Sequence, residues 1–337
     1  MSVILLAIVC VVAADPLPVT PFEAPKFGVK TAIPVAWPIA IRERDDRIFV
    51  AMIPQEDPDR PGVVACELGL APETLDEYRT RLDGASQRNS RPGGKLARNE
   101  VVKTPSGDRL ETLWEFRPRG GGLWRELSVR LVAHRQMYTF TLNADEMMYP
   151  IAKTAFDQLI TATIFTPPNT GAIADPKVPG RWIQGEFGFT IDLAEGWTPV
   201  LAPNEVALFY ANGPAHGIWS DNMLVIGSEG PPLDYPDMAR ILPDQLREVE
   251  PKCEVISCKV IDQAKGKALE TIVRTQRGPF SMTVLERRFR GEKINFEVKY
   301  TIESKRFDQL APQLRKSLDT FTELPGVRRT ATPKRPG

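Results

Sequence analysis

The sequence contains one pattern twice. A Phe-Gly pair, followed ten residues later by Trp, occurs at Phe27 and Trp37 and returns at Phe187 and Trp197, 160 positions further on. Leu-Glu-Thr at 110–112 returns at 269–271, at an offset of 159. Unrelated segments would not hold one offset over so many positions, so the sequence predicts a tandem duplication. The positions that both copies keep then indicate what their common fold requires.

Length and charge set limits on the class of protein. The 337 residues predict two domains, and a repeat of roughly 140 residues is large enough to bury its own core. Forty-three basic residues balance 43 acidic ones. A neutral chain has no overall electrostatic attraction to nucleic acid or to an anionic membrane. We therefore expect no nucleic-acid partner.

The first residues are typical of a secretion signal. Val3 to Val12 is almost entirely apolar, which is too short for a membrane span of about 20 residues but suits a signal peptide. Small residues at the −3 and −1 positions predict cleavage after Ala14. We expect an exported protein, in the periplasm or at the cell surface or beyond, with no membrane span after signal removal. An uncleaved apolar arm or a misplaced start codon stays as the alternative.

Composition divides the rest of the chain. Proline and glycine gather in the connecting segments, which predicts turns and linkers there. The predicted boundaries are a signal peptide at 1–14, a Pro-rich lead-in at 15–26, repeat 1 at 27–165, a Pro/Gly linker at 166–180, repeat 2 at 181–322 and a disordered basic tail at 323–337.

Within each repeat, hydrophobic periodicity predicts strands and two helices. A capping box at Thr74 and Glu77 predicts the start of the middle helix of repeat 1. In repeat 2, Pro243 is expected to end one helical turn and begin another, and Ser304 is expected to cap the last helix. The predicted strands of repeat 1 are 28–41 (broken near two prolines), 47–53, 62–70, 96–102, 109–116, 123–133 and 136–142. Strands in an antiparallel meander with packed helices indicate an α+β fold, present twice.

Two motifs carry a family resemblance. The segment from Phe187 to Trp197, Phe-Gly-Phe-Thr-Ile-Asp-Leu-Ala-Glu-Gly-Trp, resembles the opening of the Mog/PsbP-like fold, and the segment from Phe307 to Phe321 resembles its last helix. The group includes the photosystem II extrinsic protein P and exported bacterial proteins. The resemblance implies a PsbP-like layered sandwich in each repeat and a non-enzymatic binding or assembly role. It brings no catalytic residue and no cofactor. Repeat 1 departs from the motif, because Ala36 precedes Trp37 where glycine is expected.

Two glutamate pairs are the candidate chemistry. Glu111 with Glu126, and Glu270 with Glu286, lie on successive predicted strands in the two repeats. Paired carboxylates could serve a glycosidase or a calcium site if they met across the strands. The alternative is that they pair with arginines on the same strands, Arg125, Arg130, Arg287 or Arg288, and we favour this alternative.

Other candidate residues point to packing or to binding. Trp37 and Trp197 are shared, which predicts a place in the core. Trp219 is unshared and falls in a predicted loop, where it could contact a partner. An odd number of cysteines remains after signal removal (Cys66, Cys253, Cys258), which argues against a disulfide framework.

From the sequence we therefore expect a non-catalytic exported binding or scaffolding protein that acts on a protein or envelope component, without a cofactor or metal. The alternative is a carboxylate-dependent enzyme, such as a hydrolase, that uses the two glutamate pairs.

Overall fold

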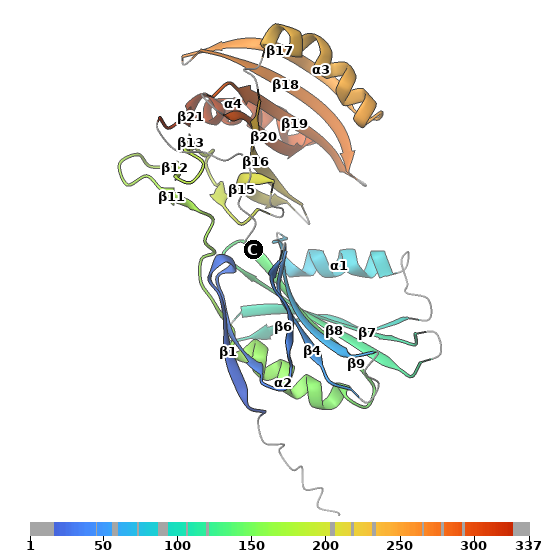
Figure 1. Cartoon of the computed structure of the whole chain (residues 1–337). Coiled ribbons are helices and arrows are strands. Elements are labelled where there is room, and N and C mark those ends of the chain that lie inside the picture. The colour runs from blue at the N-terminus through green and yellow to red at the C-terminus, as the bar shows by residue number, and fades with distance from the viewer. Residues whose placement is uncertain are drawn as a thin grey trace, which may run out of the picture.

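The computed structural model describes residues 17–325, apart from short gaps at 45, 56–59, 73, 87–93, 106, 119–120, 203–205, 217–218, 231–233, 265, 278–279 and 292–293. The expected signal peptide and most of the expected basic tail lie outside the described residues. The chain forms two α+β halves, each built on an antiparallel sheet (Figure 1). The predicted fold class is confirmed.

The first half is built on a seven-stranded sheet in the order β3-β4-β5-β9-β8-β7-β6. Consecutive strands from β6 to β9 are neighbours, as in the predicted meander. The bounds are β3 Ile39–Arg44, β4 Arg47–Ile53, β5 Gly62–Leu70, β6 Lys95–Thr104, β7 Gly107–Phe116, β8 Trp124–Ala133 and β9 Gln136–Asp145. These bounds agree closely with the predicted strands, because alternating burial on one face fixes both the period and the register.

The second half repeats this sheet in the order β14-β15-β16-β20-β19-β18-β17. The bounds are β14 Thr198–Pro199, β15 Ala207–His216, β16 Trp219–Glu229, β17 Glu254–Gln263, β18 Gly266–Arg277, β19 Phe280–Phe289 and β20 Ile294–Glu303. The strand pairing shows which residues of the two halves are equivalent. Ala51 faces Val64 as Ala211 faces Met223, so the offset of about 160 holds in space as well as in sequence.

A small sheet completes each half, and one strand of each small sheet comes from a segment that composition had marked as a connector. In the first half the order is β1-β2-β10 (Val19–Ala24, Val29–Pro34, Ile164–Phe165); in the second it is β11-β12-β13-β21 (Ala172–Ala174, Arg181–Gln184, Phe189–Asp192, Thr322–Glu323). The expected lead-in therefore contributes β1 to the first half, and the expected linker contributes β11 to the second. Proline in these segments is tolerated because such strands are short and lie near sheet edges.

A shared glycine fixes the turn into β2 in the first half and into β13 in the second half. Gly28 has φ of +66° and Gly188 has φ of +67°, a left-handed backbone that other residues rarely adopt. A β-carbon on Gly28 would also lie 2.0 Å from the carbonyl oxygen of Thr166. The Phe-Gly motif is thus explained by backbone geometry.

Four helices cover the sheets within the described residues. They are α1 Leu75–Ser86, α2 Tyr149–Ala162, α3 Tyr235–Val249 and α4 Ser304–Thr320. The Glu77 amide donates to Thr74 Oγ1 at 3.2 Å, as the predicted capping box requires. Two predictions were wrong. α3 runs through Pro243 without a break, and the N-cap of α4 is Glu303, with no side-chain cap.

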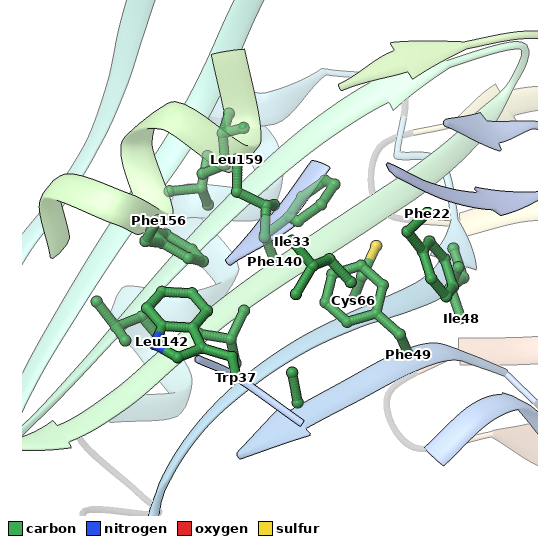
Figure 2. Close-up of a cluster of buried hydrophobic side chains, with 14 of the residues drawn as sticks. Phe22, Ile33, Trp37, Ile48, Phe49, Cys66, Phe140, Leu142, Phe156 and Leu159 are labelled. Carbon is green, nitrogen blue, oxygen red and sulfur yellow. The ribbon is translucent and has the colours of Figure 1, made fainter. Parts of the chain in front are cut away.

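The two shared tryptophans lie in two separate cores. Trp37 is 4% exposed and packs with Leu142 and Phe140 in the first half (Figure 2). Trp197 is 6% exposed and meets Tyr300 edge-on, with ring centroids 4.9 Å apart. The predicted core positions are confirmed. Cys66 is buried in the first core, as expected for a small apolar residue, and burial raises the pKa of its thiol.

Candidate functional site: the junction between the two halves

The structure does not bring the glutamates of either pair together. On the paired strands Glu111 lies opposite Val129, whereas Glu126 lies opposite Trp114. Side chains alternate between faces along a strand, and three positions separate 111 from 114, so the two carboxylates point to opposite faces of the sheet. In the second half Glu286 lies opposite Thr271, the neighbour of Glu270, with the same result.

Each glutamate instead has cationic neighbours. Glu111 is held by Arg98 at 2.9 Å and Arg109 at 2.7 Å, rather than by the arginines expected from the sequence. In the second half, Arg287 pairs with Glu270 at 3.0 Å and Arg288 with Glu286 at 2.6 Å, as expected.

Burial lowers the pKa of the Arg130 guanidinium, and the nearby carboxylate of Glu126 partly opposes this effect. Carboxylates neutralised in this way on opposite faces cannot act as a pair on one substrate. The geometry therefore gives no support to the carboxylate-dependent enzyme.

Trp219 is not in a loop but begins β16, where it pairs with His216. The placement of its side chain lies outside the described part of the structure, so a partner contact there stays a prediction. The next residue of β16 connects this hairpin to the first half. Ser220 is 4% exposed, and its Oγ donates to the carbonyl oxygen of Ala71 in the other half at 3.1 Å.

Two further contacts, one hydrogen bond and one packing contact, join the halves at this junction. Arg135 Nη1 donates to the carbonyl oxygen of Gly196 at 2.7 Å. Leu201, in the segment before β15, belongs to the buried cluster of the first half. Gly196 precedes Trp197, so the junction adjoins the core of the second half directly.

Arg135 reaches the second half from a strained turn. The two residues that join β8 to β9 are His134 with φ of +48° and Arg135 with φ of +61°. Such two-residue hairpins normally use Asn-Gly or similar residues, because a side chain in the left-handed region costs about 1–2 kcal/mol. Strain that persists in a fold points to a function of the residues that carry it. Here the turn presents a guanidinium at the junction.

A cavity of about 260 Å³ lies at this junction. It is lined from the first half by Ala71, Pro72, Val132 and Arg135, and from the second half by Asn212, Gly213, Pro214, Ala215 and Ser220. Asn212 is 2% exposed, and its Oδ1 has no hydrogen-bond partner among the described residues. Buried side-chain oxygens are normally paired, so this exception marks the cavity as a candidate binding site.

Sequence reasoning did not find Arg135 or Asn212. The sequence did contain a signal at Asn212, because the second repeat has a polar residue where the first repeat has an apolar one. Asn212 pairs with Asn222 in the position where Met52 pairs with Val63. Nothing in the sequence showed that this one substitution would face the other half.

Buried charge also lies beneath the junction hairpin. Asp221 is fully buried, and it accepts hydrogen bonds from Arg306 Nη1 at 2.5 Å and from the Glu303 amide at 3.3 Å. Burial raises the pKa of the Asp221 carboxyl above its ordinary value, against the lowering effect of Arg306. This pair anchors β16 to the start of α4.

Within the described residues there is no group of three or more side chains that could hold a metal ion.

No protein-family model and no curated protein sequence matches the chain. Among solved structures, cyanobacterial PsbP (CyanoP) from Synechocystis sp. PCC 6803 is 14% identical, covering 46% of this chain and 96% of its own, with a TM-score of 0.33. LpqN, involved in cell envelope biogenesis of Mycobacterium tuberculosis, is 15% identical over 44% of this chain and 91% of its own, with a TM-score of 0.34. Both cover about half of the chain, in agreement with the PsbP-like resemblance of the sequence motifs. At these identities the likeness concerns the fold alone.

A longer match is to the immunity protein TplEi of T6SS from Pseudomonas aeruginosa, in complex with an "L" peptide. It is 10% identical, covering 86% of this chain and 99% of its own, with a TM-score of 0.28. None of the described helices is long and apolar enough to span a membrane.

Proposed function

We propose that the protein is a non-catalytic, exported binding protein, and that it recognises a protein partner through the junction between its halves. The observation that carries the proposal is the junction cavity with its buried, unpaired Asn212 Oδ1. The cavity suits recognition of a partner, because it has a defined shape and hydrogen-bonding groups in its walls. The TplEi structure holds an "L" peptide.

Export is part of the same proposal. It rests on the apolar run before Ala14, and determination of the amino terminus of the mature protein tests it. A mature chain that begins at Asp15 in an envelope or external fraction is the expected result. A chain from the cytosol that still begins at Met1 would contradict it.

Two exposed apolar residues provide a matched test of the binding surface. Val132 is 43% exposed and lines the cavity, whereas Ile256 is 45% exposed on the edge strand β17 of the second half. Either change to arginine adds the same charge and a similar bulk to a strand surface. The wild-type chain and both variants would be used to capture partners from the native envelope, and the Kd of any captured protein would be measured after its purification.

We expect the wild-type chain and Ile256→Arg to bind the same protein with similar Kd, and Val132→Arg to bind it at least about tenfold more weakly. Equal binding by all three chains would show that the partner contacts another surface. Failure of the wild-type chain to bind any protein would contradict the proposed function itself.

A further inference from the structure

The unpaired amide oxygen of Asn212 is not needed by the fold. The equivalent position of the first half is Met52, which lies on β4 as Asn212 lies on β15, in the same register with the next strand. The first half forms its sheet with this apolar side chain. A buried acceptor without a donor is unfavourable, because it loses water and gains nothing in exchange. The second half therefore carries an acceptor that its own packing neither requires nor satisfies.

Hydrogen-bond donors lie at the same cavity. Arg135 uses Nη1 to hold the Gly196 carbonyl oxygen, and a guanidinium has five N–H donors in all. Arg135 is exposed, so its remaining donors can meet a ligand. The cavity thus offers one buried acceptor from the second half and a set of donors from the first.

The other walls are apolar and small. They are formed by Ala71, Pro72, Val132, Pro214 and Ala215. The volume of about 260 Å³ compares with about 30 Å³ for one water molecule, so a group the size of one amino-acid residue fits. A ligand that suits the cavity is apolar on its sides and has one donor and one acceptor.

We propose that the cavity binds a main-chain peptide group of an extended polypeptide segment, with the ligand N–H donated to Asn212 Oδ1 and the ligand C=O accepting from Arg135. This inference rests on the proposed function and names the chemistry of its contact. A peptide group carries its donor and acceptor on one planar unit, flanked by α-carbons that suit the apolar walls. A carboxylate would place an acceptor against Asn212 Oδ1, and an ammonium group would lie near the like charge of Arg135.

The test uses two small probes that differ in one group. N-methylisobutyramide has a single peptide-like N–H, the donor that the proposal requires, and methyl isobutyrate replaces that N–H with an oxygen and has no other N–H. Each is titrated into the full chain labelled with ¹⁵N at asparagine, and the side-chain NH₂ signals are followed by NMR. We expect the amide to shift the Asn212 signal in a saturable way, and the ester to bind about tenfold more weakly, which corresponds to one unmade hydrogen bond to a buried acceptor.

Two variants exchange residues between the repeats. Asn212→Met installs the residue of the first half, and it should abolish amide binding while raising the melting temperature, because an unpaired buried acceptor is removed. Asn143 also has a buried, unpaired Oδ1, and it pairs with Val63 in the position where Thr301 pairs with Asn222. Asn143→Thr removes the same kind of group away from the cavity and should leave binding unchanged. The asparagine signals that remain report whether each variant is folded.

Several outcomes would overturn the proposal. These are equal affinity for amide and ester, saturable binding that survives Asn212→Met, or no shift of the Asn212 signal up to the solubility limit of the amide. The proposed function would stand in each case if the partner still distinguished Val132→Arg from Ile256→Arg. If that distinction also failed, both proposals would be wrong.

Discussion

Truncating Trp197 tests whether the two halves are independent folding units. Its ring is 6% exposed, packs edge-on against Tyr300 and lies under Gly213, where a β-carbon would be only 2.8 Å from the ring. A buried tryptophan removes about 200 Å² of surface from water, and at about 25 cal/mol per Å² this gives about 5 kcal/mol. Measured truncations of this kind cost about 3–5 kcal/mol. The loss is a large part of the roughly 5–15 kcal/mol that stabilises a domain.

Urea unfolding and hydrogen exchange measure the effect. With a urea dependence of about 2 kcal/mol per M, Trp197→Ala should lower the unfolding midpoint of the second half by about 2 M. Hydrogen exchange read by mass spectrometry should show faster exchange in β15, β16 and β20, with β5, β8 and β9 nearly unchanged. Trp37→Ala is the matched control, because that ring is 4% exposed in the other core, and it should give the reverse pattern.

The reasoning would be refuted in either of two ways. Unchanged exchange in the second half would show that Trp197 does not contribute to its core. Equal loss of protection in both halves after either change would show one cooperative unit, so that the junction contacts bind the halves more strongly than the separate cores indicate.

Four further substitutions have clear expected outcomes. Glu270→Gln should cost about 1–3 kcal/mol in urea unfolding, because Arg287, whose side chain is 4% exposed, loses its buried carboxylate partner and keeps the exposed Asp319; Glu111→Gln should cost less, since its arginine partners are about one-third exposed. Asp221 has a folded-state pKa above its unfolded value, so it binds protons better when folded; lowering the pH from that raised pKa toward 3.8 should stabilise the wild-type chain relative to Asp221→Asn, as melting curves would show. Gly28→Ala should strongly destabilise the first half in thermal unfolding, because a β-carbon there overlaps a backbone carbonyl.

Most of the fold could be predicted because equivalent positions of the two copies can be compared with each other. Strands such as β4, β5 and β7 were found almost to the residue, since alternating burial marks them directly. Two strands of the small sheets, β1 and β11, were missed because they lie in segments whose composition is typical of connectors, and each is defined by its pairing with the next strand in the chain. Pro243 was judged by local propensity, yet α3 continues through it because packing of Tyr235 and Leu242 against Leu269 holds the helix in place.

The candidate site was harder to predict than the fold for a physical reason. The glutamate pairs were sought by spacing along the strands, but the strand register decides the face, and it placed Glu111 and Glu126 on opposite faces. The junction depends on contacts between the repeats, which no comparison within one repeat can show. A periodic pattern carries information about the core of each half and none about which surface of one half meets the other.

The differences between the repeats are therefore more informative about binding than the features they share. Shared residues such as Trp37 and Trp197 are explained by packing. By contrast, Asn212 replaces an apolar Met52 at a cost to stability, and Arg135 sits in a left-handed turn that asparagine or glycine would adopt with less strain. Two unfavourable features from different repeats meet at one cavity, and packing within either half explains neither. This coincidence favours recognition at the junction over an accident of divergence, and the exchange of Asn212 for methionine separates the two explanations.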